Sequence, residues 1–262
     1  MIESKPEVQL IATGNFSTIF LNKSSESFVI KQYNKQELAP FHNEVRALKR
    51  VTDHSNIIQI YSFCYLEANL RLEFINGYNL AEVIQTITNE QIIEMTKDIC
   101  KALIHLQSIG VLHNDIKPQN IMYSTVEECW KLIDFGCAQI IEDQQESETS
   151  NDLHIQKSYS KEQSNFGTIS YMPKERYTKE NGIDTRSDLW SLGIVLLQCL
   201  RKGNHPHNFY DCSLDYFAIY FDLEDFKEEI SQEWYLILKT VLLEDKNERI
   251  WPLELLSKFN LL

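Results

Sequence analysis

Polar side chains with complementary chemistry lie close together in the middle of the chain, in the stretch 113–120, His-Asn-Asp-Ile-Lys-Pro-Gln-Asn. Asp115, Lys117 and Asn120 offer a carboxylate, an ammonium group and an amide, and apolar residues lie on both sides of the stretch. A step of five residues within one loop can aim Asp115 and Asn120 at a common point. One group can then face an incoming hydroxyl while the other holds a metal ion. This suits phosphoryl transfer, because that reaction depends on positioning and charge neutralisation. The alternative is a surface turn with chance polar residues.

Two further segments carry charged residues at the ends of strand-like runs. Asp134 follows Asn120 by fourteen residues, in the sequence Asp-Phe-Gly. Lys31 ends the run that begins at Phe28, and Glu44 lies on the helix predicted to follow. Taken alone, each signal is weak, since a lysine at a strand end is commonly just solvated. Together with the stretch 113–120 they indicate one site.

These segments resemble the catalytic motifs of eukaryotic-type protein kinases of the serine/threonine class. The family's loop reads His-Arg-Asp-x-Lys-x-x-Asn, so the resemblance implies that Asp115 accepts or orients a substrate hydroxyl and that Lys117 contacts the γ-phosphate. It also implies that Asn120 and Asp134 hold Mg²⁺, with Mn²⁺ as an alternative ion. Lysine at position 117 is the form usual in serine/threonine kinases.

The same resemblance implies an ATP site. Lys31 would pair with Glu44 and direct its ammonium group at the α and β phosphates. The family's Gly-x-Gly-x-x-Gly loop corresponds to residues 12–17, where only Gly14 is retained. The missing glycines put the affinity for ATP in question, but not the identity of the nucleotide as ATP. Leu72 is the expected gatekeeper beside the adenine. The predicted nucleotide-contacting residues are Ile11, Ala12, Gly14, Asn15, Phe16, Ser17, Ile19, Val29, Lys31, Glu73, Ile75 and Met122.

The second half of the chain contains motifs that are structural in the family. Gly167–Glu175 is similar to Gly-Thr-x-x-Tyr-Met-Ala-Pro-Glu, and the resemblance implies that Glu175 pairs with Arg249. Asp188, in Asp-Leu-Trp-Ser-Leu-Gly, would brace the catalytic loop through backbone hydrogen bonds. Small-molecule phosphotransferases generally lack these motifs.

Hydrophobic periodicity predicts the elements that position these residues. Strands are expected at 8–12, 18–22, 28–33, 57–63 and 70–75, with one helix at 40–51 and a turn at Asn76-Gly77. Helical spacing begins at Asn89 and stops at Gly110, and a buried helix is expected at 190–200. The expected fold class is α+β, a bilobal kinase-like fold with a small antiparallel sheet and one helix in the N-lobe and a larger, mainly helical C-lobe. A single domain over 1–262 is predicted, with the N-lobe at about 1–74, the hinge at about 74–78 and the C-lobe at about 79–262.

Composition narrows the function classes. The formal charge of −13 argues against nucleic acid as a partner, because phosphates attract basic surfaces. Six scattered cysteines without a Cys-x-x-Cys pair disfavour zinc and a disulfide framework. The charged N-terminus and the absence of a long apolar run predict a soluble cytoplasmic or intracellular protein with no signal peptide and no membrane span.

Regulation is suggested by one departure from the family motif. Asn114 replaces the arginine that normally receives an activation-loop phosphate, so a non-RD kinase with basal activity, or one controlled by a regulatory protein partner, is expected. Cys137 is expected to pack rather than to react. The segment 134–175 is either merely solvated or a carrier of autophosphorylation sites at Ser147, Thr149, Ser150, Ser158, Ser160 and Ser164.

Three hypotheses follow. The first is a serine/threonine protein kinase that transfers the γ-phosphate of MgATP to protein hydroxyls, with a weaker resemblance to dual-specificity spindle-checkpoint kinases. The second is a pseudokinase that binds nucleotide as a scaffold, and the third is a small-molecule kinase.

Overall fold

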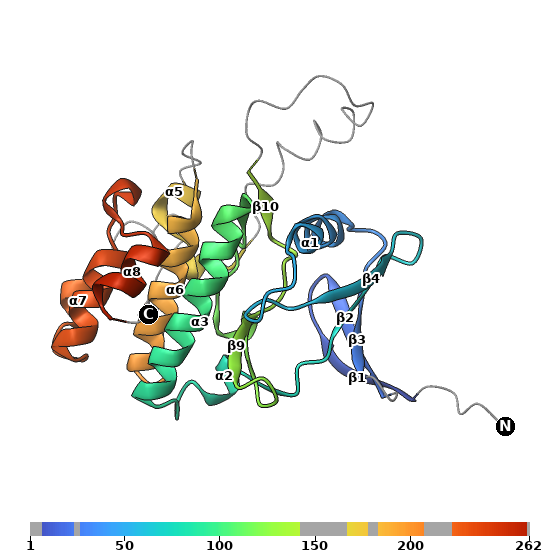
Figure 1. Ribbon diagram of the computed structural model, residues 1–262, viewed down its shortest axis with the longest axis horizontal. Coiled ribbons are helices and arrows are strands. Elements are labelled where there is room, and N and C mark those ends of the chain that lie inside the picture. Colours follow the sequence, from blue (N-terminus) through green and yellow to red (C-terminus); the bar gives the residue numbers. More distant parts are fainter. Residues whose placement is uncertain (1–6, 24–26, 142–166, 178–182, 207–221, 261–262) are drawn as a thin grey trace, which may run out of the picture.

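The computed structural model describes residues 7–23, 27–141, 167–177, 183–206 and 222–260. A five-stranded antiparallel sheet and one helix form one end of the molecule, and the longer helices form the other (Figure 1). The strand order is β1-β2-β3-β5-β4. The strands are β1 (Glu7–Thr13), β2 (Ser17–Lys23), β3 (Phe28–Tyr33), β4 (Ile60–Cys64) and β5 (Asn69–Glu73).

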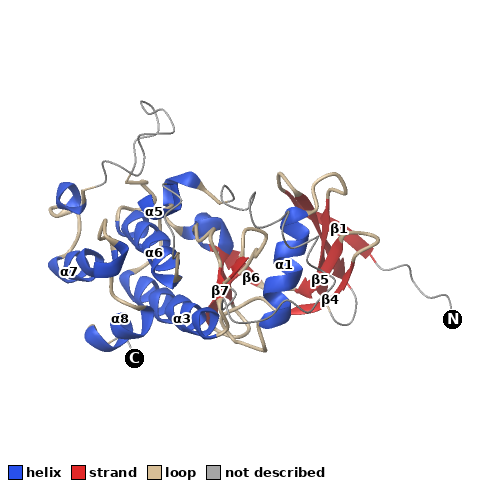
Figure 2. Cartoon of the chain, turned by 90° about the horizontal axis from the view of Figure 1, so that it is seen from above, coloured by secondary structure: helices blue, strands red, loops and turns tan. Residues whose placement is uncertain are grey.

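Helix α1 (Ala39–Arg50) lies beside this sheet (Figure 2). Pro40 lies in its first turn, where a missing N–H costs no helical hydrogen bond. Phe41, Val45 and Leu48 recur at helical spacing and are buried. Burial of this stripe turns Glu44 inward as well, so the helix presents a carboxylate to the interior.

The helical part consists of α2 (Leu80–Val83), α3 (Asn89–Ser108), α5 (Lys174–Tyr177), α6 (Thr185–Leu200), α7 (Gln232–Val241) and α8 (Pro252–Lys258). Two small sheets lie between it and the large sheet, β6 (Gly77–Asn79)-β8 (Ile121–Ser124)-β9 (Cys129–Leu132) and β10 (Gln139–Ile140)-β7 (Val111–Leu112). Short 3-10 turns are η1 (Pro118–Asn120), η3 (Ile169–Tyr171), η5 (Leu223–Phe226) and η6 (Lys246–Glu248). None of the helices in the described ranges combines the length and the apolar character needed to cross a membrane.

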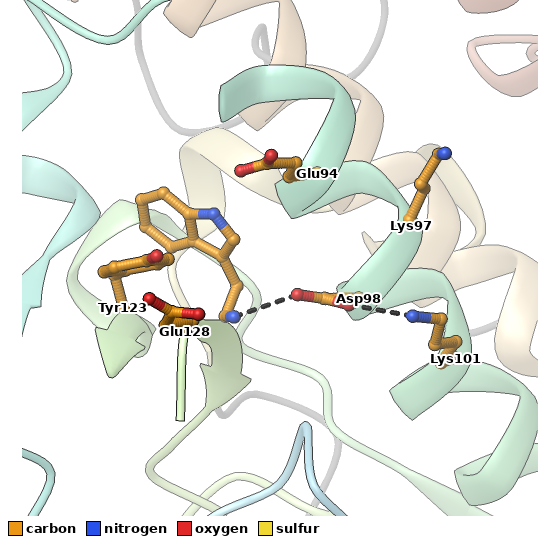
Figure 3. A pocket seen from close by; sticks show the side chains of 7 residues that line it. Glu94, Lys97, Asp98, Lys101, Tyr123 and Glu128 are labelled. Atoms are coloured by element: carbon orange, nitrogen blue, oxygen red, sulfur yellow. Dashed lines mark hydrogen bonds and ion pairs between the residues drawn. The ribbon is translucent and has the colours of Figure 1, made fainter. Parts of the chain in front are cut away.

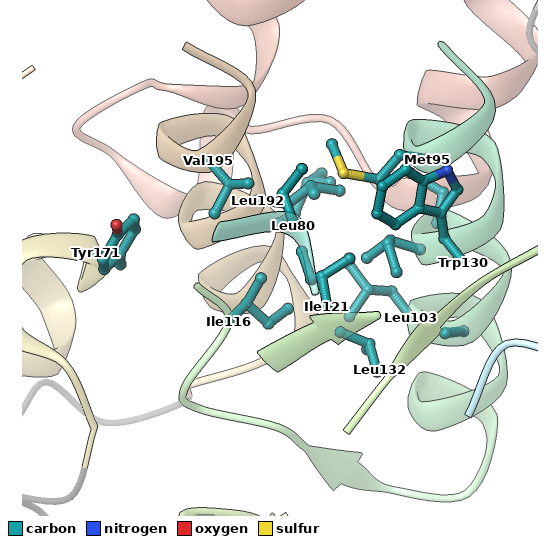
Figure 4. Packing of buried hydrophobic residues seen from close by; sticks show 14 of the residues in the cluster. Leu80, Met95, Leu103, Ile116, Ile121, Trp130, Leu132, Tyr171, Leu192 and Val195 are labelled. Carbon is teal, nitrogen blue, oxygen red and sulfur yellow. The ribbon is translucent and has the colours of Figure 1, made fainter. Parts of the chain in front are cut away.

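A hydrophobic core anchors the loop that follows β7 at its middle and where it enters β8. Ile116 and Ile121 are fully buried, and Figure 4 shows them among Met95, Leu103 and Leu192 from the long helices. Burying an isoleucine side chain stabilises the fold by about 1.5–3 kcal/mol. The polar residues next to these two anchors, Asp115, Lys117 and Asn120, are therefore held on a rigid base.

Asp98 ties strand β9 to helix α3. Its carboxylate accepts hydrogen bonds from the backbone N–H of Trp130 at 3.0 Å and from Lys101 Nζ at 3.0 Å (Figure 3). A hollow of about 380 Å³ opens beside these groups, also lined by Tyr123 and Glu128. Since β9 leads directly to Asp134, this contact helps to position that residue.

The predicted fold class is confirmed, with an antiparallel sheet and one helix followed by a mainly helical part. The predicted lobe boundaries and hinge stay predictions. The strand predicted at 57–63 was wrong at its start, because β4 begins at Ile60. Ile57 and Ile58 are buried against β9 instead, where the Ile58 N–H donates to the Leu132 carbonyl at 3.0 Å.

Other boundaries also differ from the prediction, such as the end of β5, which is Glu73 and not Ile75. Helix α6 begins at Thr185 rather than at 190, because the Asp184 side chain caps it by accepting from the Arg186 N–H at 2.9 Å. The predicted turn at Asn76-Gly77 leads directly into β6, whose Gly77 lies opposite Ser124. A Cβ on Gly77 would lie 1.8 Å from the Tyr123 carbonyl oxygen, so only glycine permits this close pairing.

Candidate active site

Asp188 of α6 holds the loop after β7 through hydrogen bonds to the loop backbone. The backbone N–H groups of His113 and Asn114 donate to its two carboxylate oxygens, both at 2.8 Å. Asp188 is 1% exposed, so these bonds lie away from water. The expected bracing role of Asp188 is confirmed as a contact.

Replacing Asp188 by Asn is expected to lower the free energy of unfolding by roughly 1–3 kcal/mol, since the Asn Nδ2 cannot accept and one buried N–H loses its partner. The midpoint of urea denaturation measures this loss. An unchanged midpoint would contradict a bracing role for the carboxylate.

Asp115, Lys117 and Asn120 converge on one point. Lys117 Nζ lies 2.7 Å from Asp115 Oδ2. Asn120 Nδ2 donates to the same oxygen at 2.9 Å and to the Asp115 backbone carbonyl at 2.8 Å. The 3-10 turn η1 makes this possible, because it folds Asn120 back over the loop. The three groups predicted from the sequence are therefore brought together.

Thr168 completes this group, although the sequence indicated it only as part of a family motif. Its backbone N–H and its hydroxyl donate to Asp115 Oδ1 at 2.8 and 2.7 Å. Its Oγ1 also accepts from Lys117 Nζ at 2.8 Å. Gly167 permits the approach, since it has φ +129° and a Cβ there would lie 2.6 Å from the Asn114 carbonyl oxygen. The motif itself was the available signal, but spacing alone does not show that Thr168 meets Asp115.

Lys31 lies between two carboxylates in a second group. Its Nζ is 2.8 Å from Glu44 Oε2 and 2.8 Å from Asp134 Oδ1. The predicted Lys31–Glu44 pair is confirmed. The Lys31 and Glu44 side chains are 5% and 0% exposed, whereas the Asp134 side chain is 44% exposed.

Electrostatics keep Lys31 and Asp134 charged. Burial lowers the pKa of Lys31, but the charges of Asp134 and Glu44 outweigh it and leave the pKa well above its usual value. The surrounding protein raises the pKa of Asp134, but Lys31 overrides this effect and brings the pKa down to about 2. Asp134 is therefore an acceptor-only carboxylate at neutral pH, as a ligand of a divalent cation must be.

Backbone contacts join the two groups. The Ile133 N–H donates to the Asn120 carbonyl at 3.0 Å, and the ring of His113 contacts the Ile133 carbonyl at 3.1 Å. Asp134 follows directly, with φ +66°. These bonds bring Asp134 next to the loop that carries Asp115 and Asn120.

The residues predicted to contact a nucleotide lie on the large sheet, in the turn between β1 and β2, just after β5, and on β8. Gly14 turns the chain between β1 and β2, where its N–H donates to the Ser17 carbonyl at 2.8 Å. In the sheet register Ile19 is opposite Lys31 and Val29 is opposite Leu72. Ile11, Ala12, Gly14 and Asn15 are exposed, Phe16, Ser17, Ile19, Glu73 and Met122 are half-buried, and Val29 and Ile75 are buried. Their contacts to nucleotide stay predictions.

Glu175 and Arg249 form a buried ion pair, which confirms the predicted pairing. Arg249 Nη1 and Nη2 donate to Glu175 Oε1 and Oε2 at 2.5 and 2.9 Å. The Ser187 hydroxyl also donates to Glu175 Oε1 at 2.8 Å. Each residue is 3% exposed, so the pair links α5 to the segment before α8 in the interior.

Asn114 offers no cation at the position that precedes Asp115. It has φ +65°, and its Nδ2 donates to the Cys137 carbonyl at 3.2 Å. Burial, with the charges of Asp115 and Asp134, raises the pKa of the Cys137 thiol to about 12. The thiol therefore stays protonated, in line with a packing role. The serines and threonine considered as autophosphorylation sites, at 147, 149, 150, 158, 160 and 164, lie outside the described residues.

Comparison with known proteins gives a match of residues 6–259 to the family model described as the protein kinase domain. The chain is 34% identical over 221 residues to the probable serine/threonine-protein kinase nek3 of Dictyostelium discoideum, covering 77% of this chain and 18% of that protein. It is 29% identical over 192 residues to the probable serine/threonine-protein kinase fnkB of the same organism, covering 71% of this chain and 34% of that protein. It is 33% identical over 138 residues to the serine/threonine-protein kinase PknB of Mycobacterium tuberculosis, covering 52% of this chain and 20% of that protein. The chain thus spans between 18% and 34% of the length of these relatives.

Proposed function

The chain belongs to the protein kinase family, and on that premise we propose that it transfers the γ-phosphoryl group of MgATP to serine or threonine hydroxyls of proteins. The observation that carries the proposal is the convergence of Lys117, Asn120 and Thr168 on the Asp115 carboxylate. The serine/threonine preference is supported by Lys117 and by the names of the relatives.

Asp115 takes the proton in the proposed reaction. The acceptor oxygen forms a bond to the γ-phosphorus while the bond to the bridging β–γ oxygen breaks, and the hydroxyl proton passes to the Asp115 carboxylate. Lys117 neutralises charge on the transferred group. Lys31, oriented by Glu44, binds the phosphates of the nucleotide.

Asp134 and Asn120 would hold the metal ion. The described residues contain no group of three His, Cys, Asp or Glu side chains that could hold a metal by themselves. This suits Mg²⁺, which binds through one or two carboxylates together with substrate phosphates and water. The half-exposed, ionised Asp134 and the adjacent Asn120 fit that requirement. When bound, the ion would neutralise charge on the phosphates.

Activity independent of a phosphorylated loop is part of the proposal. Asn114 carries no charge, and its amide is engaged by the Cys137 carbonyl, so it offers no cation to a phosphate. Control by a regulatory protein partner is the alternative.

The test uses the purified chain, γ-labelled ATP with Mg²⁺ or Mn²⁺, and a generic basic protein. Label is expected in phosphoserine or phosphothreonine, it should require the divalent ion, and prior phosphatase treatment should leave the rate unchanged. The Asp115→Asn variant gives the background rate of label transfer. Nucleotide binding with transfer no greater than that background would favour a scaffold and exclude the proposed activity.

Thr168→Val removes the hydroxyl that lies between Asp115 and Lys117 while nearly keeping the side-chain shape. We expect kcat to fall about tenfold, because a hydrogen bond to a charged group is lost. Steady-state kinetics measure it. The matched control is Thr86→Val. The Thr86 hydroxyl donates to the Val83 carbonyl, away from Asp115 and Lys117, so its loss should leave kcat unchanged. Equal kcat values for the two variants would contradict a role for the Thr168 hydroxyl.

A further inference from the structure

The carboxylate of Glu44 receives two hydrogen bonds in addition to its ion pair with Lys31. Glu44 is fully buried, and its Oε2 both contacts Lys31 Nζ at 2.8 Å and accepts a hydrogen bond from the Tyr33 hydroxyl. Its Oε1 accepts from the Phe135 N–H at 3.1 Å. Three donors from two separate segments therefore fix the orientation of this side chain.

Tyr33 is rigidly placed to make this bond. It lies two residues after Lys31 on β3, so the two side chains share one face of the sheet. Tyr33 is 3% exposed, its ring packs edge-on against Phe41 at a centroid distance of 5.7 Å, and Lys31 Nζ lies 5.2 Å from the ring centre. Its hydroxyl cannot leave Glu44 without disturbing packed neighbours.

Lys31 contacts two carboxylates, so a hydroxyl that fixes one of them affects where the Lys31 ammonium group lies. Asp134 lies as close to Lys31 Nζ as Glu44 does, but its side chain is 44% exposed. Without a fixed Glu44, the ammonium group is free to shift toward the more exposed carboxylate of Asp134. A hydroxyl that immobilises Glu44 Oε2 therefore limits the positions that Lys31 can take.

A second tie acts on the same helix. Asn43 is 6% exposed, and its Nδ2 donates to the Gly136 carbonyl at 3.2 Å. With the Phe135 N–H bond to Glu44, it fastens α1 to the segment 134–136. Neither the Asn43 contact nor the Glu44 contact depends on a positive charge at position 114, where the family has an arginine.

We propose that Tyr33 is a positioning residue, whose hydroxyl orients Glu44 so that Lys31 is held ready for the nucleotide phosphates. The inference rests on the proposed function and adds to it, since it assigns the alignment of Lys31 to side chains on β3 and α1 rather than to a phosphorylated loop. The competing explanation is purely structural, in which the hydroxyl only satisfies a buried carboxylate.

Tyr33→Phe separates the two explanations, because it removes the hydroxyl and keeps the ring. We expect kcat/KM for MgATP to fall about tenfold, mostly as a higher KM for ATP, with the KM for the protein substrate unchanged. A structural role alone reduces the folded fraction, which lowers the apparent kcat and leaves the KM for ATP unchanged. Thermal denaturation of each variant, measured in parallel, gives the folded fraction.

Tyr235→Phe is the matched control. Tyr235 lies on α7, and its hydroxyl likewise donates to a carboxylate, that of Glu224 in η5. It should leave the KM for ATP within twofold of the wild-type value. In a Glu44→Ala background, Tyr33→Phe should change this KM less than twofold, because the group through which it acts is gone.

A Tyr33→Phe variant with wild-type KM for ATP would overturn the inference, as would an equal effect with and without Glu44. Titration with MgATP measures the nucleotide Kd directly and serves as a readout that does not depend on transfer. If the wild type transfers no phosphate but Tyr33→Phe still weakens its MgATP binding about tenfold, the proposed function fails while the positioning role of Tyr33 stands.

Discussion

Replacing Asp115 by Asn is expected to lower kcat for phosphoryl transfer by about 10²–10⁴-fold, the range that general-base catalysis contributes. The amide is nearly the same size, and its oxygen can still accept from the Thr168 N–H. It cannot take the hydroxyl proton, and it no longer attracts the Lys117 ammonium group, which is 2.7 Å from the carboxylate. Single-turnover transfer of labelled phosphate measures the loss.

Two controls accompany this prediction. Asp222→Asn changes an exposed carboxylate that caps η5 through the Glu224 N–H, and it should leave kcat unchanged. The Kd of the Asp115→Asn variant for MgATP should stay within about threefold of the wild-type value, since Lys31 and Asp134 are untouched. A fall in kcat of less than tenfold would contradict the role of Asp115 as general base.

Arg249→Met is expected to lower the free energy of unfolding by about 3–5 kcal/mol, because it leaves the Glu175 carboxylate buried without its cation. Glu175 is 3% exposed, so water cannot replace the guanidinium. For a chain of this size the loss corresponds to a fall in Tm of roughly 6–20 °C. Scanning calorimetry or circular dichroism during heating measures it.

The double variant Glu175→Met with Arg249→Met should recover part of the lost stability, since it removes both charges of the pair. The exposed pair Lys35–Glu67, at 3.1 Å, provides the comparison. Lys35→Met should cost at most about 1 kcal/mol because both side chains are solvated. Equal losses for Arg249→Met and Lys35→Met would contradict a structural role for the buried pair.

Local sequence patterns predicted most of the elements that carry the site. The six residues of β3 were predicted with their observed ends, and α1 was predicted within one residue at each end. Both succeed because a strand of alternating burial and a helix with an apolar stripe are visible in short windows. The strand predicted at 57–63 failed because Ile57 and Ile58 are apolar for a different reason, their contact with β9, which lies more than 70 residues away.

The sequence by itself determined the family, through Asp115, Asn120, Asp134 and their spacing, because those residues lie on short segments whose order along the chain is informative. The tertiary structure decided which side chains meet. The contacts of Thr168 with Asp115, of Tyr33 with Glu44 and of Asn43 with Gly136 join segments 53, 11 and 93 residues apart. A hydrogen bond depends on distances of a few tenths of an ångström, and only the packing of whole helices and strands fixes these.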